Sequence, residues 1–235
     1  MSSVISTSIP VQPLLRRRLD STATLLAFDC SGGACSAAVL AGGVVRAERF
    51  AVMERGQAEA IMPQIRDVMA EAGIGFAALD ALATTVGPGS FTGLRIGLAA
   101  ARGLALPSGR PVLAPTAFEA YLAQVEEALP VIVAIDSRRG PVFVQRFGAD
   151  RKPLADPASV EAEAAGGCLP DGRAIVIGDG TGPFAALGHR DLDIRPARIR
   201  AVDVARAALL TDPERPPVPL YLRPPDATMM RAPVP

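Results

Sequence analysis

The chain has 235 residues but only one histidine (His189), one lysine (Lys152) and no tryptophan. Zinc sites built on HExxH or on paired histidines need two imidazoles, so a single histidine excludes them. A Ser-His-Asp triad would depend on His189 alone, which lies beside Gly188 in an expected loop. One lysine also excludes most lysine chemistry. We therefore expect no catalytic residue and no metal ligand in this chain.

Charge, cysteine and long apolar runs are also scarce. The 24 basic and 24 acidic side chains cancel, so the chain lacks the basic character of proteins that bind a phosphate backbone unaided. Cys30, Cys35 and Cys168 form an odd set without metal-site spacing, which favours reduced thiols. No apolar run reaches the roughly 18 residues that span a bilayer, and the first 21 residues lack the apolar region of a signal peptide. We expect a cytoplasmic protein.

Two segments, one in each half, share a strand-turn-strand plan. Residues 25–40 contain a strand that ends at Asp29, a turn with Gly32, and a returning strand; residues 131–147 repeat this plan around Asp136. Turn amides and hydroxyls can donate to phosphate oxygens, and a carboxylate can hold hydrated magnesium. Asp29, Ser31, Gly32 and Asp136 are therefore candidate nucleotide contacts. The alternative, that both aspartates only cap their turns, stays open.

A glycine-rich loop follows the buried strand expected over residues 80–86 and precedes a helix expected over residues 94–106. Unpaired amides at a helix start favour an anion, so Gly87, Gly89 and Ser90 are candidate phosphate contacts. No Lys-Ser/Thr pair follows, so the loop is not a Walker A motif. The alternative is a tight structural loop with Thr92 as the helix N-cap. We expect Gly89 and Gly93 to hold backbone conformations or close approaches that a side chain would spoil.

Periodicity and composition predict the remaining organisation. Apolar spacing indicates helices over residues 58–72, 117–129 and 202–210, and Pro63 requires a kink or a late start in the first of them. A strand that ends in a glycine turn is expected over residues 174–180, before a helix near Pro183. The predicted domains are a disordered extension (1–23), two subdomains (24–108 and 109–215) and a proline-rich tail (216–235).

The loop sequence from Val86 to Gly97 closely resembles the signature of the TsaB (YeaZ) family, a subunit of the bacterial machinery that makes N6-threonylcarbamoyladenosine in tRNA. Flanking segments agree, so the likeness covers roughly residues 25–227; they are Phe28–Ser31, Met62–Ile65, Ala134–Arg139, Gly178–Gly180 and Tyr221–Ala227. The resemblance implies an α/β protein with an actin-like ATPase (ASKHA) fold, built from two duplicated subdomains that each contain a hairpin. Two departures stand out: Gln57-Ala58 replaces a usual His-Ser pair, and Ser137-Arg138-Arg139 replaces a tripeptide that is often less basic.

The resemblance also implies partners. Members form a heterodimer with TsaD, which binds metal and transfers the threonylcarbamoyl group to the adenosine next to the anticodon, and the ATPase TsaE docks on that pair. We accordingly expect tRNA to be reached through the complex. We expect no cofactor of the chain's own, with ATP or ADP bound weakly or at the partner interface. A homodimer, and a free-standing ATPase or small-molecule kinase, remain alternatives.

The helix expected over residues 94–106 has almost no polar face. Its own sheet can cover one side, so the other side needs a second cover. A partner is the simplest cover, and we predict the partner contact at Ile61, Ile65, Met69, Leu94 and Leu98. The alternative is a helix buried entirely by its own domain.

Overall fold

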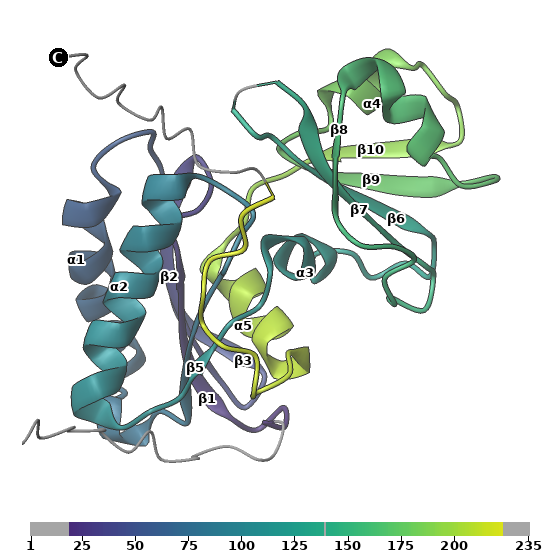
Figure 1. The fold of residues 1–235 in the computed structure, drawn as a ribbon. Coiled ribbons are helices and arrows are strands. Elements are labelled where there is room, and N and C mark those ends of the chain that lie inside the picture. The colour runs from purple at the N-terminus through teal and green to yellow at the C-terminus, as the bar shows by residue number, and fades with distance from the viewer. Residues whose placement is uncertain (1–18, 139, 223–235) are drawn as a thin grey trace, which may run out of the picture.

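The computed structural model describes residues 19–138 and 140–222. It contains two five-stranded mixed sheets (Figure 1). The first sheet has the order β3-β2-β1-β4-β5, and the second, read from its β8 edge, has the order β8-β7-β6-β9-β10. The strands are β1 (Thr24–Asp29), β2 (Ala34–Ala41), β3 (Val44–Val52), β4 (Ala81–Thr84), β5 (Val112–Leu113), β6 (Val131–Ile135), β7 (Val142–Phe147), β8 (Ala158–Val160), β9 (Ala174–Gly178) and β10 (Leu192–Pro196).

The two sheets have the same pairing pattern. In each, the first strand pairs antiparallel with the second and the second with the third, while the first pairs parallel with the fourth and the fourth with the fifth. The same five-strand order in both halves confirms the predicted duplication. It also confirms the predicted actin-like architecture of two related α/β subdomains.

Helices cover both faces of the first sheet (Figure 1). The helices are α1 (Gln57–Ala72), α2 (Phe91–Ser108), α3 (Ala117–Leu122), α4 (Gly182–Ala186) and α5 (Ala201–Leu210), with 3-10 turns at Phe76–Ala78 and Ala162–Cys168. Alternate side chains of β1 point toward opposite faces of the sheet, as in any strand that is buried on both sides. Leu26 and Phe28 belong to the apolar cluster with α1, whereas Leu25 and Ala27 belong to the cluster with α3 and α5.

Several boundaries differ from those predicted. Helix α1 begins at Gln57 and runs through Pro63, so the late start was wrong. Helix α2 begins three residues earlier than predicted, and its N-cap is Ser90, not Thr92. Helix α3 ends at Leu122 instead of Leu129, because a non-helical turn follows it.

The halves of the structure do not separate at residue 109. Strand β5 lies beyond that residue yet pairs with β4 in the first sheet, and α5, from the end of the chain, packs against the same sheet. One apolar cluster runs through both sheets and includes Leu25, Phe118, Val133 and Val204. The two predicted subdomains therefore share a core, and the first is completed by residues from the C-terminal part.

The two predicted terminal segments are described only in part. Residues 1–18 of the extension and 223–235 of the tail lie outside the described residues. Of the remainder, Ala23 is buried and Leu19 packs against the shared core, so the ordered chain begins before residue 24. Across residues 19–138 and 140–222, no helix combines the length and the apolar character needed to cross a membrane.

Asp203, in the first turn of α5, makes stability depend on pH. The residue is 4% exposed, and its carboxylate accepts a hydrogen bond from the Arg200 amide at 3.0 Å. Burial raises the pKa of Asp203 to about 6. The positive charges of Arg200 and Arg206 oppose this rise, and the negative charge of Glu48 adds slightly to it. This folded-state pKa exceeds the ordinary 3.8. The contribution of protonated Asp203 to the free energy of unfolding is therefore complete below pH 4 and is lost as pH rises through about 6.

Replacing Asp203 with asparagine keeps an acceptor for the Arg200 amide and removes the charge. We expect Asp203→Asn to be more stable than the parent by about 1 to 3 kcal/mol at pH 8 and nearly equal to it near pH 4. Thermal unfolding of both proteins at the two pH values measures this difference. A difference that is the same at both pH values would show that ionisation is not its cause.

Candidate functional site

Asp29 lies at the end of β1 inside a closed hydrogen-bond network. The residue is 3% exposed. Its carboxylate accepts hydrogen bonds at 2.9 Å from both the amide and the hydroxyl of Ser31, and it also accepts one from the Thr85 hydroxyl, just after β4. Burial raises the pKa of Asp29, and these hydrogen bonds partly oppose the rise. Both carboxylate oxygens are occupied inside the chain, so this arrangement does not fit a hydrated magnesium ion.

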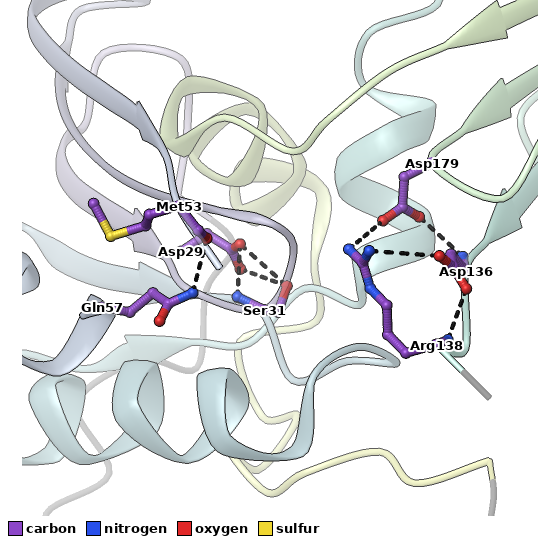
Figure 2. Close-up of polar contacts among 7 residues, drawn as sticks. All are labelled: Asp29, Ser31, Met53, Gln57, Asp136, Arg138 and Asp179. Carbon is purple, nitrogen blue, oxygen red and sulfur yellow. Dashed lines mark hydrogen bonds and ion pairs between the residues drawn. The ribbon is translucent and has the colours of Figure 1, made fainter. Parts of the chain in front are cut away.

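In the second half, an arginine lies between two carboxylates (Figure 2). Asp136 follows β6 and Asp179 follows β9. The Arg138 guanidinium lies 3.2 Å from Asp179 and 3.5 Å from Asp136, and the Arg138 amide donates to Asp136 at 2.7 Å. Burial raises the pKa of Asp179, while Arg138 lowers it. The protein's own cation therefore balances the carboxylates that a metal ion would otherwise need to neutralise.

Arg138 also connects the two hairpins. A Cβ built on Gly33, in the first hairpin turn, would lie 3.4 Å from Arg138 Nη2 and 3.9 Å from Arg198 Nε. Figure 2 shows the Asp29 network beside the Arg138 cluster. The two predicted aspartates are thus at neighbouring hairpins. Asp179 also lines a cavity of about 500 Å³ together with Arg198 and Arg200.

The glycine-rich loop packs directly on the first hairpin turn. The Ser90 amide donates to the Ser31 carbonyl at 2.8 Å, and the Leu94 amide donates to the Ser90 carbonyl at 2.9 Å. The Gly93 amide donates to Ser90 Oγ at 3.3 Å. The amides of Ser90, Gly93 and Leu94 are therefore paired within the chain and are not available to an anion.

Three of the loop glycines lie where no side chain fits, and two of them approach the first hairpin turn. A Cβ on Gly89 would lie 2.7 Å from the Ser31 carbonyl oxygen, and one on Gly93 would lie 1.9 Å from the Cys30 carbonyl oxygen. The predicted close approaches are confirmed. Gly87 approaches a different segment. Its carbonyl accepts a hydrogen bond from the Ala117 amide, and its Cβ position lies 2.8 Å from the Leu220 carbonyl oxygen.

The five predicted partner contacts lie in the interior of the chain. The exposed fractions are 2% for Ile61, 1% for Ile65, 6% for Met69, 1% for Leu94 and 3% for Leu98. These side chains face the first sheet or the interior beside it, because α1 and α2 pack side by side on that sheet (Figure 1). A partner on these two helices would have to contact their other, exposed positions.

An exposed stripe runs along the outer face of α2. It consists of Phe91, Arg95, Ala99, Arg102 and Leu106, which we call the α2 stripe; this spacing places all five on one side of a helix. Phe91 is 42% exposed and Leu106 is 81% exposed.

The described part of the tail lies beside the α2 stripe. The Tyr221 ring lies 5.4 Å from the Phe91 ring, and Arg95 lies 3.7 Å over the Phe91 ring. Arg102 donates to the Pro217 carbonyl at 3.0 Å. The sequence analysis missed this surface because it counted apolar positions without knowing which face the sheet covers.

Comparisons with known proteins place these features in context. A family model described as TsaD, tRNA N6-adenosine threonylcarbamoyltransferase, matches residues 40–172. Two proteins named tRNA threonylcarbamoyladenosine biosynthesis protein TsaB are similar: one from Haemophilus influenzae is 39% identical over 51% of this chain and 52% of its own length, and one from Escherichia coli is 34% identical over 59% and 61%. The chain therefore spans about half to three fifths of the length of these relatives.

Two solved structures that match over most of the chain are both from Pseudomonas aeruginosa. One is that of an uncharacterized protein with similarity to the peptidase YeaZ. This structure is 30% identical, has a TM-score of 0.74, and is matched over 86% of this chain and 100% of its own. A second structure, named YeaZ and also from Pseudomonas aeruginosa, is 28% identical with a TM-score of 0.74, over 85% and 100% of the two chains.

Proposed function

Because the chain belongs to the TsaB (YeaZ) family, we propose that it is a non-catalytic subunit that binds and supports TsaD. TsaD would transfer a threonylcarbamoyl group to N6 of the adenosine next to the anticodon of tRNA. The observation that carries this proposal is the match to the YeaZ-like structure over 86% of this chain and all of the other. The names of the two TsaB relatives indicate the pathway, which is tRNA threonylcarbamoyladenosine biosynthesis.

The geometry of the two hairpins supports a subunit without its own phosphoryl chemistry. A nucleotide-hydrolysing site needs a carboxylate available to a hydrated metal ion. Here Asp29 is buried and bonded to Ser31 and Thr85, and Asp136 is paired with Arg138. The proposal assigns binding, not turnover, to this chain, and any ATP or ADP in the complex would lie mainly on a partner or at the interface.

The α2 stripe is the surface that we assign to TsaD. Interface hot spots are enriched in aromatic residues and arginine near the centre of a patch. Phe91, Arg95 and Tyr221 form such a cluster on an exposed helix face. TsaE would dock on the assembled pair, and tRNA would be reached through the complex. A homodimer that uses the same stripe would compete with TsaD.

Mixing the purified chain with TsaD tests the proposal. We expect light scattering to report a one-to-one complex, and threonylcarbamoylation of tRNA to require both subunits in the mixture. The chain alone is expected to hydrolyse no ATP above background, because neither hairpin offers a free carboxylate. ATP turnover by the chain alone at an ordinary enzymatic rate, lost in Asp29→Ala, would instead identify it as an ATPase.

A further inference from the structure

A large groove lies beside α3. Its volume is about 1030 Å³, and its walls come from α3, α5, strand β7 with the loop after it, and the chain segment from Arg215 to Leu220. Apolar side chains form much of the surface, among them Leu122, Val125, Phe147 and Leu220. Grooves of this size with mostly apolar walls and a few polar groups are typical of ligand sites.

The charged groups that line this groove are mainly cations. They are Arg151, Lys152, Arg206 and Arg215, against the single carboxylate of Glu119. Glu119 is matched by Arg215, whose guanidinium lies 2.5 Å from it, and Lys152 lies 3.1 Å from Asp150. Arg151 and Arg206 have no carboxylate within ion-pair distance among the described residues, although Arg206 is near enough to Asp203 to lower its pKa.

The two arginines differ in the accessibility of their donors. Arg206, on the exposed side of α5, makes no hydrogen bond or ion pair with any described residue. Arg151 donates from Nη2 to the Glu127 carbonyl, but its Nη1 is buried and has no partner among the described residues. Arg151 also has a left-handed backbone, with φ of 66°. Strained non-glycine residues of this kind cluster at ligand sites.

The chain's own termini are poor occupants for this groove. Residues 1–18 contain three arginines and no acidic residue, and residues 223–235 contain two arginines and one aspartate. The side chains of both segments carry a net positive charge, as do those that line the groove. An occupant of opposite charge is favoured, and a guanidinium with unused donors binds an oxyanion in bidentate geometry.

We propose that this groove binds a small organic anion in which an oxyanion head is attached to an apolar body. The head accepts from the exposed guanidinium of Arg206, the positive charge of Arg151 at the same groove adds attraction, and the body packs on Leu122, Val125 and Phe147. This site is separate from the α2 stripe, from the Asp29 network and from the Arg138 cluster.

The fluorescent anion 1-anilinonaphthalene-8-sulfonate provides the probe, because it joins an aromatic body to a sulfonate. We expect saturable binding of one dye per chain, and about tenfold weaker binding by Arg206→Gln, the loss of one charge-assisted contact of roughly 1.4 kcal/mol. Arg66→Gln is the matched control, since Arg66 lies on α1 with a side chain that is 75% exposed. Its dissociation constant should equal that of the parent.

A neutral dye separates charge from hydrophobic contact. N-phenyl-1-naphthylamine has the same rings without the sulfonate, so we expect weaker binding to the parent and no response to Arg206→Gln. Ala123→Phe, which fills the groove, should weaken both dyes. Equal affinity of the parent for the two dyes, or an anionic dye that is insensitive to both Arg206→Gln and Ala123→Phe, would overturn the proposal.

Discussion

Replacement of Gly93 by alanine is expected to destabilise the protein by about 3 to 5 kcal/mol, or to prevent folding. The new Cβ would lie 1.9 Å from the Cys30 carbonyl oxygen and 2.8 Å from its carbon. Both are backbone atoms at the end of β1, so no side-chain rotation can relieve the overlap. Helix α2 would have to move away from the first hairpin, and the Ser90 to Ser31 hydrogen bond of 2.8 Å would be lost.

Gly103 in the same helix provides the matched control. No atom lies within 4 Å of its Cβ position, so Gly103→Ala should gain up to about 1 kcal/mol from helix propensity. Thermal unfolding monitored by circular dichroism measures both, and for a chain of this size the Gly93 effect corresponds to a fall in Tm on the order of 10 °C. Similar melting of the two variants would show that the loop tolerates a wider separation from the hairpin.

The second large effect is expected at the α2 stripe. A glutamate in place of Phe91 or Leu106 should weaken TsaD binding at least 30-fold, about 2 kcal/mol, because each change removes an apolar contact and requires a charge to be desolvated in the interface. Both side chains are exposed in the free chain, at 42% and 81%. The variants should therefore melt close to the parent, and isothermal titration with TsaD would report the loss.

Leu154→Glu is the control for this pair. Leu154 is 59% exposed and lies between β7 and β8 in the other half of the molecule, so its charge should not affect TsaD binding. Retention of full affinity by Phe91→Glu and Leu106→Glu would move the interface away from α2. Weakening by all three substitutions would instead indicate a nonspecific effect of added charge.

The parts of the fold that were predictable from the sequence are those encoded locally. The two hairpins, whose turns follow Asp29 and begin at Asp136, have apolar runs broken by glycine. Strand β4, the loop and α2 follow one another without long-range contacts. Strand β3 escaped prediction because it is an edge strand with mostly exposed residues and no clear apolar alternation. Strand β5 has only two residues, Val112 and Leu113, too few for a periodic signal.

The candidate site was only partly predictable, since its partners come from distant segments. The sequence indicated Asp29, Ser31 and Asp136, but not that Thr85 would bond to Asp29 or that Arg138 would bridge two carboxylates. Those contacts depend on which strand ends meet. The buried positions of Ile61 and Leu94 likewise depend on how the helices are rotated on the sheet, which an apolar pattern alone does not specify.

The return of α5 to the first sheet has a consequence for synthesis on the ribosome. The sheet is complete in sequence at Leu113, but the helix that covers one of its faces ends at Leu210. At a translation rate of about 5 to 20 residues per second, roughly 5 to 20 seconds pass between synthesis of the last strand of the sheet and synthesis of the end of α5. The nascent chain therefore exposes Leu25 and Ala27 throughout that interval, and a chaperone that binds apolar segments would meet them before α5 does.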